Sequence, residues 1–217
     1  MHALSQISEG MKNVQYMCHI CDAQLPEHWG KERNKNGKLN NKLGFSHSEV
    51  MICLLHINER ITEQLSISLN NEEQNLNQIQ RILNADRVLQ NVNLLTFNDE
   101  DNNDARIYLT NNQAFYLIDN YYNLFYKQLK VNKNLKEAWD TYKYIIYDLY
   151  KGVKDVSTLK TKCNNFFQLM KIISKVNWYI HYLKYHVELL VYSTNYKLNN
   201  ISNEGLENTH KIIQKNR

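Results

Sequence analysis

Apolar residues recur at helical spacing along most of this chain, and the longest such stretch covers residues 157–198. The stretch contains no Pro or Gly, and its apolar positions repeat every seven residues in two registers. The first register is Phe166, Ile173, Ile180 and Val187, and the second is Leu169, Val176, Leu183 and Leu190. Heptads that continue in this way indicate a helix with one apolar face from end to end. We therefore predict one long C-terminal helix over 157–198 at the centre of the fold.

Shorter amphipathic segments precede and follow this stretch, with apolar residues three or four positions apart. They predict helices within residues 2–25, 46–69, 70–89, 110–131 and 134–152, and a short one over 201–215. Ser46 and Glu49 fit a capping box, in which each side chain bonds the backbone N–H of the other residue. Thr110 and Gln113 mark another helix start with the same spacing. These patterns predict a chain made mostly of helices.

Residues 93–110 are predicted to form an acidic loop, with a short extended run at 107–109. Gly152 fits the C-terminal cap of the preceding helix. The remaining connections are short, which favours antiparallel neighbours in a bundle. One Pro and six Gly are too few for a turn-rich β fold. The fold class is therefore expected to be all-α, with six to seven helices packed around the long C-terminal helix.

The length of 217 residues and the hydrophobic share of 43% are sufficient for one domain with its own core. We expect a single helical domain over 1–217. Within it, residues 1–56 form an N-terminal subregion and residues 57–217 form the bundle. The subregion contains a predicted mobile basic loop over 27–45, which is rich in Asn, Lys and Gly.

Composition and charge restrict the function only weakly. The net charge of +4 permits nucleic-acid binding without arguing for it. No stretch approaches eighteen apolar residues, and the N-terminus lacks the pattern of a signal peptide. Four Cys are too few for a disulfide scaffold. We expect a reduced, soluble, intracellular protein of the cytoplasm or nucleus, and the frequent Asn, Lys, Ile and Tyr are typical of an A+T-rich genome.

One candidate metal site stands out, formed by Cys18 and Cys21 together with Cys53 and His56. Each pair has a two-residue gap, which lets both side chains converge on a tetrahedral ion, as in structural Zn²⁺ sites. Four protein ligands would leave no open position, so the zinc would be structural and would tie the N-terminal segment to the bundle. Two alternatives remain open: the cysteines are inert core residues, or Cys18 and Cys21 form a redox motif.

A second candidate site is the aromatic face of the long helix, opposite its heptads. Its residues are Trp178, Tyr182, Tyr185, Tyr192 and Tyr196, with lysines on either side. Aromatic residues are enriched in interface cores, so this face is a candidate for binding a protein partner or a second copy of the chain. The alternatives are packing inside the same chain, or stacking of unpaired nucleic-acid bases with phosphates on the lysines.

A third candidate is the basic part of the N-terminal loop. Its residues are Lys31, Arg33, Lys35, Lys38 and Lys42. Side chains of this kind suit phosphate contacts that position a nucleic acid without reading its sequence. The alternative is a solvated loop with no ligand.

Other chemistry finds little support in the sequence. The acidic residues 99–104 do not fit a calcium-binding EF-hand loop, because Asp104 occupies the position of the required Gly and Thr110 that of the required Glu. His181 and His186 are five residues apart, about 140° round a helix, and are not expected to form a ligand pair. Motifs for serine or cysteine nucleophiles are absent from the sequence.

The sequence therefore favours a non-enzymatic helical interaction or assembly protein that acts within a larger complex, and a structural zinc ion would stabilise it where the four candidate ligands converge. The first alternative is a nucleic-acid-associated zinc protein that contacts phosphates through residues 31–42. The second is a helical enzyme whose active site shows no recognisable motif. No small-molecule substrate and no membrane contact are indicated.

Overall fold

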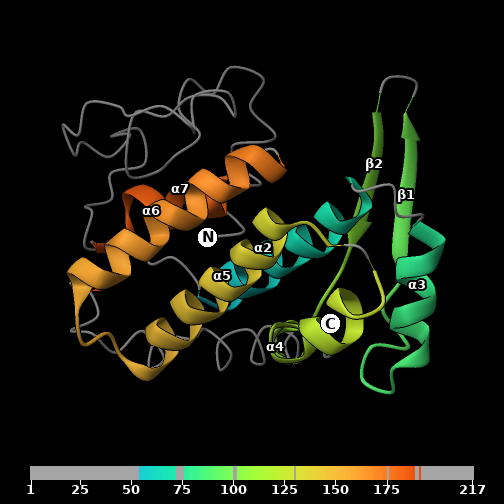
Figure 1. Cartoon of the computed structure of the whole chain (residues 1–217), viewed down its shortest axis with the longest axis horizontal. Helices are drawn as coiled ribbons and strands as arrows, with labels where there is room; N and C mark the ends of the chain where they lie inside the picture. Colours follow the sequence, from blue (N-terminus) through green and yellow to red (C-terminus); the bar gives the residue numbers. More distant parts are fainter. Residues whose placement is uncertain are drawn as a thin grey trace, which may run out of the picture.

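The computed structural model describes residues 54–71, 76–99, 102–129, 131–174, 176–188 and 191. Six α-helices run through these residues: α2 (Leu54–Ile67), α3 (Leu76–Ala85), α4 (Asn111–Tyr121), α5 (Lys133–Lys151), α6 (Val156–Ile173) and α7 (Trp178–Tyr185). A 3-10 turn, η4 (Ser68–Asn71), follows α2, and a π-helical turn, η5 (Tyr122–Tyr126), follows α4. The strands β1 (Leu94–Asp99) and β2 (Asn102–Ile107) form one hairpin. The predicted helical fold class is confirmed, with this hairpin as an addition (Figure 1).

The ends of α4 and α5 are set by the side chains at their caps. The predicted capping box of α4 is confirmed: Thr110 Oγ1 accepts from the backbone N–H of Gln113 at 3.4 Å, and Gln113 Oε1 accepts from the N–H of Thr110 at 2.9 Å. The side chain of Asn132 caps α5 by accepting from the N–H of Leu135 at 2.9 Å. Gly152 ends α5 with a φ of 91°, a region that glycine enters without steric cost.

The helix predicted over 157–198 is wrong as a continuous element, because α6 ends at Ile173 and α7 begins at Trp178, with extended backbone at the two cap residues Ser174 and Asn177. Asn177 caps α7 by accepting from the backbone N–H of Ile180 at 3.0 Å. Gln64 of α2 holds the break from the other side. Its Nε2 donates to Ser174 Oγ at 3.2 Å, and its Oε1 accepts from Asn177 Nδ2 at 2.7 Å. The apolar heptads continue through the break in the sequence, but the hydrogen bonds of Gln64, Ser174 and Asn177 hold the chain in a non-helical conformation there.

After the break, α7 folds back along α6. The ring of Tyr185 meets the edge of Phe167 at 5.9 Å between centroids. Farther along, Glu188 pairs with Lys160 at 2.6 Å. Because later residues of α7 meet earlier residues of α6, the two helices are antiparallel. The heptad residues that the structure describes therefore pack within one chain.

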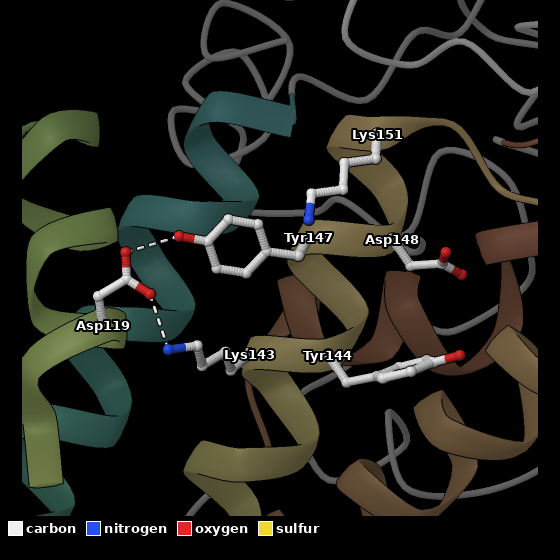
Figure 2. Close-up of a pocket in the computed structure, with 6 residues that line it drawn as sticks. All are labelled: Asp119, Lys143, Tyr144, Tyr147, Asp148 and Lys151. Carbon is white, nitrogen blue, oxygen red and sulfur yellow. Dashed lines mark hydrogen bonds and ion pairs between the residues drawn. The ribbon is translucent and has the colours of Figure 1, made fainter.

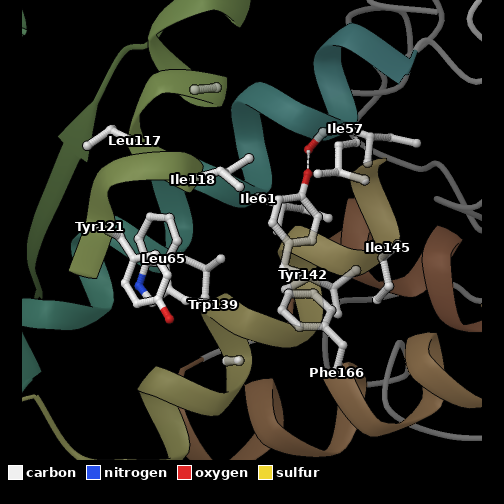
Figure 3. Packing of buried hydrophobic residues seen from close by; sticks show 14 of the residues in the cluster. Ile57, Ile61, Leu65, Leu117, Ile118, Tyr121, Trp139, Tyr142, Ile145 and Phe166 are labelled. Carbon is white, nitrogen blue, oxygen red and sulfur yellow. Dashed lines mark hydrogen bonds between the residues drawn. The ribbon is translucent and has the colours of Figure 1, made fainter. Parts of the chain in front are cut away.

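The centre of the described fold is formed by α2 and α5, and α2 contacts α4, α5, α7 and β2. The fully buried Tyr142 of α5 stacks on Phe166 of α6 at 5.3 Å, and its hydroxyl donates to the carbonyl of Ile57 at 3.2 Å. One turn earlier on α5, Trp139 stacks on Tyr121 of α4 at 5.2 Å (Figure 3). The prediction that the chain packs around its C-terminal helix is therefore wrong. The apolar stripe of α2 packs against more of the other elements than α6 or α7 does.

The acidic loop predicted over 93–110 is instead the hairpin of β1 and β2, which stands beside α3 (Figure 1). Its register runs from Leu94 opposite Ile107 to Asp99 opposite Asn102. Gln80 of α3 anchors the start of β1, because its Oε1 accepts from the N–H of Leu94 at 2.7 Å.

Glu63 of α2 fastens the chain that leaves β2. Its carboxylate accepts from the backbone N–H of Leu109 at 2.9 Å and from Arg60 Nη1 at 2.7 Å. Burial raises the pKa of Glu63, and these two bonds act in the opposite direction. The guanidinium of Arg60 also lies 5.7 Å from the ring centroid of Tyr108. Residues 107–110 are thus held against the central helix.

The helices predicted within 2–25 and over 201–215, and the capping box predicted at Ser46 and Glu49, lie outside the described residues. Among the helices that the structure does describe, none is both long and apolar enough to cross a membrane.

Candidate functional site: a tyrosine–lysine groove on α5

The residues of the predicted zinc site are mostly beyond the described part of the chain. Cys18, Cys21 and Cys53 lie outside it, and His56 is half-buried on α2. Zinc binding by these four residues therefore stays a prediction. Within residues 54–191, as far as they are described, no cluster of three or more His, Cys, Asp or Glu side chains could hold a metal ion. The basic residues of the loop 31–42 also lie outside the described residues.

The predicted aromatic partner face is divided between core and surface. Tyr182 is fully buried and packs against Trp178, with 4.8 Å between ring centroids. Trp178 and Tyr185 are half-buried, while Tyr192 and Tyr196 lie outside the described residues. The break before α7 is the reason, because the helix that folds back turns Tyr182 into the interior. Tyr182 is therefore a core residue, and partner binding by the rest of this face stays a prediction.

A groove that the sequence did not reveal lies on the outer face of α5, with a volume of about 410 Å³. One lining residue comes from α4 and five from α5: Asp119, Lys143, Tyr144, Tyr147, Asp148 and Lys151. We call it the tyrosine–lysine groove (Figure 2). Its α5 residues lie outside the stripe of buried residues on that helix. The sequence therefore does show which α5 positions face away from the core. It does not show that α4 lies across the groove from them.

Asp119 joins α4 to α5 at one wall of the groove. Its carboxylate accepts from the hydroxyl of Tyr147 at 2.7 Å and pairs with Lys143 Nζ at 2.7 Å (Figure 2). Burial opposes ionisation of Asp119, but the bonds from Lys143 and Tyr147 outweigh it and lower the pKa of Asp119. Burial, followed by the bond to Asp119, raises the pKa of Tyr147 to about 12. At neutral pH the wall therefore consists of a carboxylate, an ammonium and a protonated phenol.

The ring of Tyr147 is fixed from several directions. Lys143 and Lys151, one turn before and after it, place their ammonium groups 5.9 Å and 5.2 Å from its centroid, on opposite sides in Figure 2. Phe115 of α4 packs against the same ring at 5.6 Å. Cation–π contacts of this kind contribute about 0.5–1 kcal/mol at exposed sites. The ring is thus positioned before any partner arrives.

The other side of the groove is more open. Tyr144 is 44% exposed, and Lys162 of α6 lies 5.1 Å from its ring centroid. The pKa of Asp148 is raised by partial burial and then by the charge of Asp155, while Lys154 acts in the opposite direction. The groove therefore offers an exposed aromatic ring with one cation beside it, and a carboxylate whose charge is poorly compensated.

Comparisons of this chain with protein-family models, with curated proteins and with solved structures gave no match. The functional proposal consequently rests on the geometry of the groove.

Proposed function

We propose that this is a non-enzymatic interaction protein that binds a polypeptide segment of a partner protein in the tyrosine–lysine groove. The supporting observation is that the exposed ring of Tyr144 and the prepositioned ring of Tyr147, which point to different sides of α5 in Figure 2, both line a groove of about 410 Å³. Tyrosine is enriched in the cores and hot spots of interfaces, because it combines a large apolar surface with little rotamer entropy. Two tyrosine rings that line one groove in this way offer a docked chain two aromatic contacts.

The charges around the rings suggest the chemistry of that segment. Lys151 and Lys162 lie over the rings of the groove and suit an acidic group on the partner. Asp148, whose pKa is raised, would be stabilised by a partner lysine or arginine. A segment with one acidic and one basic group would meet both. Complementary charges of this kind determine register and specificity more than raw affinity.

A protein partner is favoured over nucleic acid by the same groove. Base stacking needs an open ring face, whereas lysines lie on both sides of Tyr147. The carboxylate of Asp148, which has no close cation of its own in the groove wall, would also repel a phosphate backbone. Nucleic-acid binding through residues 31–42 remains the alternative.

The protonation states of Asp119 and Tyr147 in the groove wall favour a binding function over proton-transfer catalysis. General acids and bases work best when their pKa lies near the operating pH. The pKa of Asp119 is lowered and that of Tyr147 is raised to about 12, so neither group changes state near neutrality. Both are held as structural partners of Lys143.

The first experiment places a photo-crosslinking amino acid at position 144 and, as a control, at position 108. Tyr108 is 51% exposed and follows β2, away from the groove. After irradiation in cells that express the protein natively, we expect one polypeptide segment crosslinked to position 144 and not to position 108. Crosslinks to RNA or DNA would instead support the nucleic-acid alternative, and crosslinks to a second copy of the chain would mean self-association. Equal crosslinking at both positions would contradict a groove-specific partner.

Charge reversal then tests the chemistry of the captured segment. Lys151→Glu should weaken binding of the purified segment, because it removes the cation next to Tyr147. Lys133→Glu is the matched control, an exposed lysine at the other end of the same helix. Equal weakening by both changes would indicate a general charge effect and not recognition by the groove.

A further inference from the structure

The break between α6 and α7 is held by side-chain hydrogen bonds. The stretch 157–198 contains no Pro or Gly, the residues that commonly end or kink a helix, and both heptad registers continue through it. Gln64 of α2 instead bonds Ser174 and Asn177, and Asn177 caps α7. We call residues 174–177 the hinge. Without these bonds, the apolar pattern on both sides of the hinge favours one continuous helix.

The contacts between α6 and α7 are centred on the hinge. Phe167 and Tyr185, whose ring centroids are 5.9 Å apart, lie nine residues on either side of position 176. Lys160 and Glu188, paired at 2.6 Å, lie fourteen residues on either side of position 174. Two straight antiparallel helices related by a twofold axis at the hinge would bring together the same pairs. The contacts of the folded-back α7 therefore suit a second copy of the chain without a change of register.

An exposed apolar side chain lies next to the hinge. Ile172 is 69% exposed, the largest exposed fraction among the large hydrophobic residues of the described part of the chain. It precedes the heptad residue Ile173, so on one continuous helix it would flank the apolar seam. The folded-back α7 leaves this side chain in solvent, whereas an antiparallel second copy would pass beside it.

We propose that two copies of this chain exchange α7, so that the hinge becomes helical and each α7 packs on α6 and α2 of the other copy. Within one chain α7 contacts these same two helices, and domain swapping has a low cost because it reuses such contacts. The helical hinge gains backbone hydrogen bonds and loses those to Gln64. Gln64 is therefore a latch that favours the closed monomer. The groove is lined by α4 and α5, so the exchange does not depend on the proposed function.

The first test removes the latch. Full-length protein is partly unfolded in urea at high concentration, returned to reducing buffer, and analysed by size-exclusion chromatography with light scattering. Gln64→Ala should raise the association constant of the dimer about tenfold or more, because each dimer loses two latches. Asn177→Ala, which removes the cap of α7 and favours helix in the hinge, should act in the same direction.

The matched control is Gln80→Ala. Gln80 also joins separate segments through its amide, by bonds to Val92 and Leu94, but it lies on α3 away from the hinge. Its removal should leave the association constant unchanged. Absence of a dimer in both Gln64→Ala and Asn177→Ala would overturn the proposal, as would an equal increase in Gln80→Ala.

A crosslink then distinguishes exchange of α7 from a side-by-side dimer. Equal amounts of ¹⁴N- and ¹⁵N-labelled Gln64→Ala are mixed before unfolding, and a carbodiimide couples the amine of Lys160 to the carboxylate of Glu188, which are in contact. In the dimer, about half of the coupled peptides should join a light and a heavy chain, as random exchange between copies requires. The monomer should give none. A dimer whose coupled peptides are all light–light or heavy–heavy would contradict the exchange.

Discussion

Two tyrosines of α5, two residues apart, show how differently the faces of this helix are used. Tyr142 is completely buried between α2 and α6, and its hydroxyl donates to the carbonyl of Ile57 (Figure 3). Tyr144 is 44% exposed beside the groove, with Lys162 over its ring (Figure 2). The side chains are identical, so the difference is one of position around the helix. The inner face stabilises the fold, and the outer face carries the exposed residues of the proposed recognition site.

The largest difference between the two faces should appear when each ring is removed. Tyr142→Ala should reduce the free energy of unfolding by about 3–5 kcal/mol, the usual cost of deleting a buried aromatic ring. Tyr144→Ala should change it by only about 0.5 kcal/mol, as surface substitutions generally do. Urea unfolding monitored by circular dichroism measures both values. Similar losses for the two variants would contradict the division of α5 into a structural and a recognition face.

A smaller effect should distinguish the two hydroxyl groups. Tyr142→Phe removes the hydrogen bond to Ile57 and keeps the ring, so we expect a loss of about 0.5–1.5 kcal/mol in the free energy of unfolding. Tyr144→Phe should be nearly neutral, because its hydroxyl group belongs to an exposed side chain. The same urea experiment applies. A cost for Tyr144→Phe as large as that for Tyr142→Phe would show that the outer ring is also structural.

The smallest effect concerns the ionic wall of the groove. Lys143 and Asp119 are 39% and 45% exposed, so Asp119→Asn should cost no more than about 1 kcal/mol at neutral pH. The pKa of Asp119 is lowered in the folded protein, so its contribution is present above the unfolded pKa of about 3.9 and disappears as the pH falls through the folded value.

Urea unfolding of wild type and Asp119→Asn, at neutral pH and in acid, measures this effect. The difference between the two proteins should vanish in acid. Glu137→Gln, which changes an exposed carboxylate of α5, is the control and should leave the free energy of unfolding within about 0.5 kcal/mol of wild type. A difference for Asp119→Asn that persists in acid would mean that the ion pair is not its cause.

Much of the inner face of α5 could be predicted from the sequence, because local rules govern it. The apolar stripe that contains Leu135, Trp139 and Leu149 is buried as its spacing predicts. The start of α4 at Thr110 follows from its capping box, and the end of α5 at Gly152 follows from glycine's backbone freedom. Each of these features depends on residues within a few positions of one another.

The features that escaped prediction depend on contacts between distant residues. The break before α7 is held by Gln64, which meets Ser174 and Asn177 from 110 and 113 residues away. Apolar heptads carry no information about that contact. Likewise, the groove requires Asp119 to meet Tyr147 across 28 residues.

The contact between His181 and His186, whose Nε2 atoms lie 3.2 Å apart, escaped prediction for a related reason. The angle of about 140° assumes that one regular helix continues through both residues. His186 instead follows the end of α7 with non-helical φ and ψ, so the angle no longer applies. A broken helix thus changes which side chains meet, as well as where the chain goes.

The central claim is that the outer face of α5 recognises a partner, and calorimetric titration tests it most directly. The segment captured at position 144 is titrated into wild type, Tyr144→Ala and Tyr122→Ala. Tyr122 is a matched control, because it is also 44% exposed but lies on η5. We predict that Tyr144→Ala weakens binding by about 2 kcal/mol, roughly thirtyfold, as at an interface hot spot. Tyr122→Ala should leave the affinity unchanged. Equal affinities for wild type and Tyr144→Ala would contradict the account.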